Sequence, residues 1–189
     1  MADLPLVPMP LVRGPRGAVV APQHLATAAG LAMLRAGGHA VDAAIATNAV
    51  LGVVVPSSCG IGGDAFWLIW DEGASRQTAL NGSGRAPAAA DPGRMVNQGL
   101  TTLPYRGPLT ITVPGAVRSW RDAHERHGRL SRADILAPAI QLARDGFPAS
   151  DGFVSSVEHT LDPVRDALGN GSGVEQVYRP NGRPWRPGE

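Results

Sequence analysis

The stretch over residues 40–54 constrains the fold most, because it has a helical pattern but small side chains on nearly every face. Small side chains let neighbouring backbones approach closely from several directions. The alanines that allow this approach are Ala43, Ala44, Ala46 and Ala49. Asp42, Thr47 and Asn48 interrupt the apolar character of the stretch, which excludes a membrane span. We therefore predict a central helix that is buried on nearly all sides.

Helices and strands surround this helix without a regular alternation. A helix over residues 23–36 precedes it and ends at Gly37 and Gly38, because glycine adopts the left-handed conformation that ends helices. Residue pattern predicts a strand over 64–71 with a hairpin partner over 77–81. Further strands are expected at 18–21 and 109–113, and further helices at 93–98, 115–127, 131–145 and 150–160. Ser131 can cap the helix that follows it. This order favours an α+β layered fold over a doubly wound sheet.

The chain of 189 residues is long enough for one domain with a substantial core. Prolines and arginines punctuate residues 1–17, which we expect to form an extended arm. Residues 18–160 hold most of the predicted helices and strands and form the domain. From Gly169 to Glu189 the composition shifts to Gly, Pro, Arg and Asn, so residues 161–189 are expected to be a loop in which the chain is truncated.

Composition and charge argue against several classes of function. There are 17 basic and 16 acidic residues, and the net charge of +1 argues against a nucleic-acid or membrane partner. A single cysteine, Cys59, excludes an intrachain disulfide and a cysteine-based zinc cluster. His124 and His127 could share a helix face, but they lack a third ligand and are expected on the solvated surface, so no metal site is predicted. The amino terminus lacks the features of a secretory signal, and a cytoplasmic protein is expected.

One glycine-rich segment formally matches a cofactor motif. Residues 60–65 (Gly-Ile-Gly-Gly-Asp-Ala) fit the Gly-x-Gly-x-x-Gly/Ala fingerprint of dinucleotide-binding proteins. That fingerprint needs a strand before it and a helix after it, so that the pyrophosphate meets a helix amino terminus. Here the predicted helix comes first and the predicted strand follows. The segment is therefore interpreted as a turn-rich loop, and no cofactor is predicted.

Ser83 and Arg85 are the candidate substrate-binding residues, in the loop after the hairpin. Ser83 lies between Gly82 and Gly84, without the spacing of a nucleophile elbow, so it is not predicted to act as a nucleophile. Arg85 is a cation between two glycine-containing turns, where the open backbone would admit a carboxylate. An arginine that ties loops together is an equally good interpretation of the same position.

Five segments in a fixed order resemble the γ-glutamyltransferase family. Residues 19–46 look like the opening of that family, and Pro-Ser-Ser-Cys-Gly-Ile-Gly-Gly at 56–63 resembles its Pro-x-Ser-x-Gly-Ile-Gly-Gly segment. The others are Arg-Ala-Pro-Ala-Ala-Ala at 85–90, Val-Pro-Gly-Ala-Val at 113–117 and Leu-Ala-Pro-Ala-Ile-Gln-Leu-Ala-Arg-Asp-Gly-Phe at 136–147. Together they cover about residues 18–155, which is too much ordered agreement for chance.

The resemblance implies an amino-terminal-nucleophile hydrolase with a four-layer αββα sandwich, of which this chain would hold only the amino-terminal portion. Such a protein is made as one precursor that cuts itself into two subunits. The new amino-terminal threonine of the small subunit then attacks an amide. The resemblance places that threonine beyond residue 189, so no catalytic residue is expected in this chain. The implied partners are a small-molecule amide substrate, the remaining large-subunit segment and the small subunit of the same precursor.

One position departs from the family pattern. Typical members carry an arginine four residues before the proline of the Ala-Pro step, where it binds the α-carboxylate of the γ-glutamyl group. Ser83 stands at that position here and Arg85 stands two residues later, a displacement of about 6–7 Å along an extended segment. Bidentate recognition then needs a rearranged loop. Three functions stay open: γ-glutamyl transfer or hydrolysis, an oxamate- or cephalosporin-acylase-like amidohydrolase of the same family, and a non-catalytic binding module.

Overall fold

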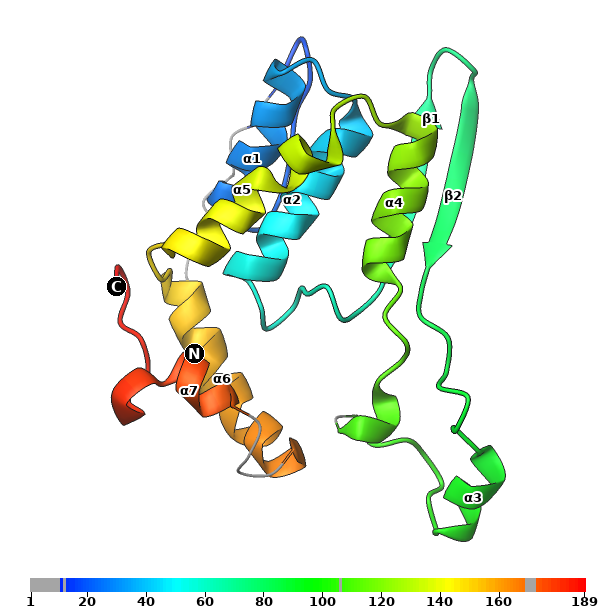
Figure 1. Ribbon diagram of the computed structural model, residues 1–189, viewed down its shortest axis with the longest axis vertical. Helices are drawn as coiled ribbons and strands as arrows, with labels where there is room; N and C mark the ends of the chain where they lie inside the picture. The colour runs from blue at the N-terminus through cyan, green and yellow to red at the C-terminus, as the bar shows by residue number, and fades with distance from the viewer. Residues whose placement is uncertain (1–10, 12, 106, 169–172) are drawn as a thin grey trace.

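The computed structural model describes residue 11 and residues 13–105, 107–168 and 173–189. In this part of the chain, helices dominate and one antiparallel hairpin lies beside them (Figure 1). The helices are α1 (His24–Arg35), α2 (Ala40–Val54), α3 (Pro92–Asn97), α4 (Ala116–His127), α5 (Arg132–Asp145), α6 (Asp151–Leu168) and α7 (Val174–Tyr178). The strands are β1 (Ala65–Asp71) and β2 (Arg76–Gly82). The fold is α+β, as the order of elements predicted.

Helix α2 is the centre of the core, as its small side chains predicted, although one of the predicted contact alanines, Ala44, is exposed. Its buried residues lie on almost every side, and α1, α4 and α5 pack around it. Figure 1 shows α2 between α5 and α4. Helix α1 approaches closely because it carries Gly30 at the contact, where a Cβ atom would lie 3.2 Å from the Ala43 carbonyl oxygen.

Local chemistry explains where the helices begin and end. Gly37 follows α1 with a φ of 86°, in the left-handed region that favours glycine. Asp42 Oδ2 accepts the His39 backbone N–H at 2.6 Å, which is half of a capping box at the start of α2. Ser131 Oγ accepts the Asp134 backbone N–H at 3.1 Å, so the predicted cap of α5 is confirmed.

The hairpin has one covered and one exposed face. Its antiparallel register pairs Ala65 with Gly82 at one end and Asp71 with Arg76 at the other. Helix α4 contacts both strands. The large apolar side chains on the uncovered face are Phe66, Leu68 and Trp70, which are 68%, 71% and 58% exposed. Side chains alternate across a strand, so these three share one side of β1.

Within the described residues, two predicted strands do not form. Residues 18–21 run near α1 without a ladder, and residues 109–113 pass from a short 3-10 helix, η1 (Pro108–Thr110), into irregular chain. A strand needs a ladder of backbone hydrogen bonds to a neighbour. Here the Val113 N–H donates to the Arg85 carbonyl oxygen at 2.9 Å, which makes one such bond and no ladder. Residue propensity alone does not show which segments find a partner.

The carboxyl-terminal part holds more helix than expected. Helix α6 continues to Leu168 instead of ending near residue 160. Helix α7 and a 3-10 turn, η2 (Pro180–Gly182), lie where a loop was expected. Most of the predicted arm lies outside the described residues, and the division of the chain stays a prediction. Among the helices described, none is both long and apolar enough to cross a membrane.

Candidate substrate-binding site

The chain leaves β2 and crosses the amino terminus of α4 at very close range. Gly82 is buried, and a Cβ atom there would lie 2.5 Å from the Ala65 carbonyl oxygen. A Cβ atom at Gly115 would lie 3.0 Å from the backbone nitrogen of Gly84. Glycine has no Cβ atom, so the two backbones can touch at this crossing. The crossing sets the path of the backbone just before Arg85.

Ser83 and Arg85 both lie exposed after this crossing. Asn81 Oδ1 accepts the Ser83 backbone N–H at 2.9 Å, which makes a side-chain-to-backbone turn at the end of the hairpin. The Arg85 carbonyl oxygen is bonded to Val113, as described above. Among the residues that the structure describes, neither the Ser83 hydroxyl nor the Arg85 guanidinium has a hydrogen bond or an ion pair. The backbone of Arg85 therefore ties the loops, while its guanidinium is exposed to solvent.

The glycine-rich loop before β1 holds the start of α4. The Gly63 carbonyl oxygen accepts the backbone N–H groups of Gly115 and Ala116, both at 3.0 Å. These amides lie at the start of α4, where backbone donors lack partners within the helix. The loop follows helix α2 and precedes strand β1, as predicted. That order is the reverse of the dinucleotide-binding arrangement.

Two tryptophans anchor α4 to its neighbours. Trp67 Nε1 on β1 donates to Ser119 Oγ at 3.0 Å. That hydroxyl donates in turn to the Ala116 carbonyl oxygen at 2.7 Å. Trp120 Nε1 donates to Asn48 Oδ1 on α2 at 2.9 Å. Sequence reasoning missed this support, because the paired residues are 52 and 72 positions apart.

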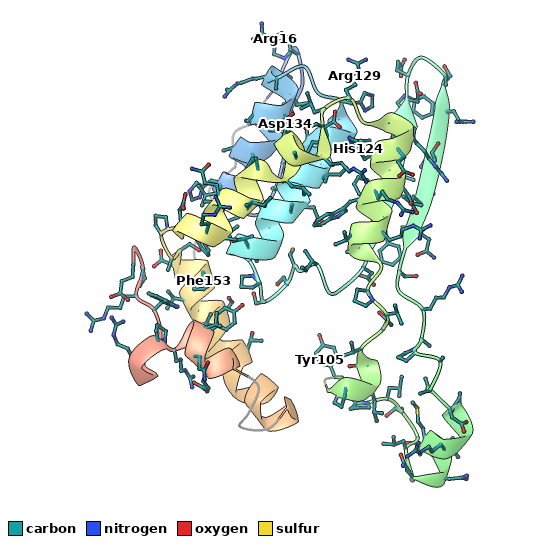
Figure 2. The ribbon with its side chains drawn as sticks, viewed as in Figure 1. Arg16, Tyr105, His124, Arg129, Asp134 and Phe153 are labelled. Carbon is teal, nitrogen blue, oxygen red and sulfur yellow. The ribbon has the colours of Figure 1, made fainter. Side chains whose placement is uncertain are left out.

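A buried carboxylate joins the turn before α2 to the turn after α4. Asp42 is 0% exposed and accepts the backbone N–H groups of His39 at 2.6 Å and of Arg129 at 3.0 Å. His124 Nε2 lies 2.8 Å from the Leu130 carbonyl oxygen and 3.8 Å from Asp42 Oδ1. Figure 2 shows His124 and Arg129 at the same end of the helices. The prediction of a solvated surface was wrong for His124, because tertiary packing covers this end of α4.

The second histidine of this pair is also partly enclosed. The rings of His127 and His39 are stacked with centroids 6.5 Å apart, and His127 Nε2 is buried. No group of three or more histidine, cysteine, aspartate or glutamate side chains in the described part of the chain could hold a metal ion. Cys59 is half-buried, and burial raises the pKa of its thiol, which makes it a poor nucleophile at neutral pH.

Residues 26–189 match the family model of the gamma-glutamyltranspeptidases, and the chain therefore belongs to this family. The glutathione hydrolase-like YwrD proenzyme of Bacillus subtilis (strain 168) is 38% identical over 179 residues, which cover 94% of this chain and 33% of that protein. The glutathione hydrolase proenzyme of Pseudomonas sp. (strain A14) is 35% identical over 180 residues, which cover 92% and 30%. The chain thus spans about a third of the length of these curated relatives.

Two solved structures share the fold over nearly the whole chain. The γ-glutamyltranspeptidase of Helicobacter pylori superposes with a TM-score of 0.83 at 27% identity, over 95% of this chain and 51% of that one. The cephalosporin acylase of Bacillus halodurans superposes with a TM-score of 0.81 at 37% identity, over 100% of this chain and 36% of that one. The resemblance seen in five sequence segments is therefore confirmed.

Proposed function

We propose that this chain is the amino-terminal part of the large subunit of an enzyme that cleaves or transfers an acyl group, γ-glutamyl or related, from a small amide. Similarity to glutathione hydrolase proenzymes and to a cephalosporin acylase over most of the chain supports the proposal. The nucleophile is an amino-terminal threonine in a segment outside this chain. Its hydroxyl attacks the amide carbonyl carbon while its own α-amino group accepts the proton. The amine then leaves with that proton, and water or an acceptor amine takes the acyl group from the ester.

The complete fold in this proposal is a four-layer αββα sandwich. The exposed side of the hairpin supports it, since Phe66, Leu68 and Trp70 form an apolar sheet face. A two-stranded hairpin is marginally stable alone, and such a face normally packs against another layer. The remaining large-subunit segment and the small subunit supply the second sheet.

The exposed position of Arg85 supports a substrate-binding role for this chain. Its guanidinium is exposed, and it follows a backbone crossing that leaves no room for a side chain at Gly82. A guanidinium binds a carboxylate through two parallel N–H···O bonds. The substrate is therefore a small amide whose acyl part carries a carboxylate. Ser83 offers a hydroxyl two residues away.

A cephalosporin-acylase-like amidohydrolase is the second candidate. Ser83 favours it, because this serine stands where the resemblance places the arginine that binds the γ-glutamyl α-carboxylate. Sequence identity does not separate the candidates, since it is 37% to the acylase structure and 38% to the glutathione hydrolase-like YwrD proenzyme. Both candidates use the same acyl-transfer chemistry and differ in the acyl group.

The substrate-binding role is tested with Arg85→Gln in the complete, processed enzyme. We expect kcat/KM to fall about tenfold to a hundredfold for γ-glutamyl and glutaryl anilides, because a charged hydrogen bond contributes about 1.5–3 kcal/mol. Butyryl anilide lacks the carboxylate and should be hydrolysed at an unchanged rate. Arg76→Gln, at the other end of β2, is the matched control and should leave all three rates unchanged. An equal fall in kcat/KM for all three anilides would instead indicate a structural role for Arg85.

The acyl groups themselves separate the two candidates. A γ-glutamyl group carries an α-amino group that a glutaryl group lacks, so a preference for γ-glutamyl anilide identifies γ-glutamyl chemistry and a preference for glutaryl anilide identifies an acylase. Ser83→Arg should raise the turnover of γ-glutamyl anilide, because it restores a guanidinium at the family position. Unchanged turnover in that variant would contradict the argument from the carboxylate.

A further inference from the structure

A groove of about 320 Å³ lies between α4 and α5, with a side chain of α2 also lining it. Its floor and walls are apolar side chains from the three helices. They are Ile45 from α2, Val117 and Trp120 from α4, and Ile135 and Leu136 from α5. This size is within the range of about 300–1,000 Å³ that is usual for small-molecule sites. An apolar ligand could therefore bury much of its surface here.

The rim of the groove is polar. His124 and three guanidinium groups line it, from Arg118 and Arg121 on α4 and Arg132 on α5, and no carboxylate is among the lining residues. Carboxylates pair with the first two: Asp122 lies 3.0 Å from Arg118 Nε and 3.1 Å from Arg121 Nη2, and Glu125 lies 3.5 Å from Arg121 Nε. Arg132 is exposed and has no ion pair within the described part of the chain. One unpaired guanidinium thus stands at the edge of an apolar surface.

This combination selects a ligand with two parts. A guanidinium forms its strongest hydrogen bonds with a carboxylate. An alkyl chain gains free energy from leaving water in proportion to the apolar area that it buries. The unpaired Arg132 guanidinium disfavours an ammonium group, and a fully polar anion would gain nothing from the apolar floor. We propose that the groove binds an aliphatic carboxylate of medium chain length, with the chain along Trp120 and Ile135 and the head group at Arg132.

Calorimetric titration of the complete protein with decanoate tests the proposal. We expect saturable binding of one decanoate, and weaker binding of decanol, which has the same chain without the charge. Arg132→Gln should weaken decanoate binding about tenfold, because it removes a charge-assisted hydrogen bond. Val117→Phe should also weaken binding, since Val117 is half exposed and a larger side chain would fill the groove without disturbing the core.

Arg126→Gln is the matched control, because Arg126 is exposed on α4 but does not line the groove. It should leave the affinity for decanoate unchanged. Absence of saturable binding would overturn the proposal. Equal affinity for decanol and decanoate, or equal losses in Arg132→Gln and Arg126→Gln, would overturn it as well.

Discussion

At the scale of single residues, Asp42 makes a polar link between helices across 87 positions of the chain. Its carboxylate is completely buried and accepts two backbone N–H groups, that of His39 and that of Arg129, which is shared between both carboxylate oxygens. Such bonds offset the cost of taking a charge out of water. Asp42→Asn keeps the volume but turns one acceptor into a donor that faces other donors. The free energy of unfolding should therefore fall by about 1.5–3 kcal/mol.

Urea unfolding of the complete protein measures this loss. Asp145→Asn is the control, because Asp145 is exposed at the end of α5 and should change the free energy of unfolding by no more than about 0.5 kcal/mol. If Asp42→Asn unfolded at the same urea concentration as the parent protein, the buried carboxylate would make no net contribution to stability.

Cys59 should be a slow thiol. Burial raises its pKa above the ordinary value of 9.0 because the thiolate loses solvation. The thiolate is the reactive form, so alkylation by iodoacetamide should reach half its maximal rate at a pH above 9.0. The folded state holds this proton more tightly than the unfolded state. The contribution of Cys59 to the free energy of unfolding should therefore decline as the pH rises from the pKa of the unfolded state to the higher pKa of the folded state. Half-maximal alkylation below that pH would show an activated cysteine.

Among the elements, β2 and α4 meet through a contact that depends on glycine. In Gly82→Ala the new methyl group would lie 2.5 Å from the Ala65 carbonyl oxygen, a backbone atom that cannot turn away. Overpacking of this kind costs about 1–3 kcal/mol. The crossing also sets the position of Arg85, so the KM for the acyl donor should rise in the same variant. Thermal unfolding and steady-state kinetics measure the two effects.

Gly62→Ala is the matched substitution in the glycine-rich loop. A Cβ atom at Gly62 would meet no heavy atom within 4 Å, and the backbone there is not left-handed. This variant should unfold within about 0.5 kcal/mol of the parent protein and keep its KM. Similar losses in both variants would show that the tight crossing is not what makes Gly82 necessary.

For the whole molecule, the proposed sandwich predicts that the exposed face of β1 is covered in the complete enzyme. Leu68 is 71% exposed in the present chain. Leu68→Lys would place a charge in the interface between the two sheets and remove a buried side chain worth about 1.5–3 kcal/mol. We expect the complete precursor to unfold at a lower urea concentration and to yield less of the processed enzyme.

Val20→Lys is the control for this prediction, because Val20 is 94% exposed and lies outside the hairpin. It should leave both stability and processing unchanged. A Leu68→Lys precursor that folds and processes like the parent protein would contradict the sandwich. Gel electrophoresis of the processed subunits measures how much precursor is cleaved. The cytoplasmic location of the protein also stays a prediction.

The helices and the hairpin could be predicted from the sequence, whereas the two further strands predicted at 18–21 and 109–113 do not form. The stop after α1 and the cap at Ser131 depend on residues close in the sequence, so the pattern indicates them directly. Residues 109–113 have strand-like composition, yet a strand forms only where a neighbour supplies its hydrogen bonds. Ser83 and Arg85 were predictable as loop residues from the surrounding glycines. The close contact of their loop with Gly115 was not predictable, because Gly115 lies about thirty residues further along the chain.

By itself, the sequence determined that α2 would be buried on nearly all sides, because its small side chains permit close packing in any direction. It also determined the family, through five segments in a fixed order. Only the tertiary structure decided which polar groups meet: Asp42 with the Arg129 backbone across 87 positions, and Trp120 with Asn48 across 72. Hydrogen bonds reach only about 3 Å, so such partners are determined by how helices pack and not by their distance along the chain.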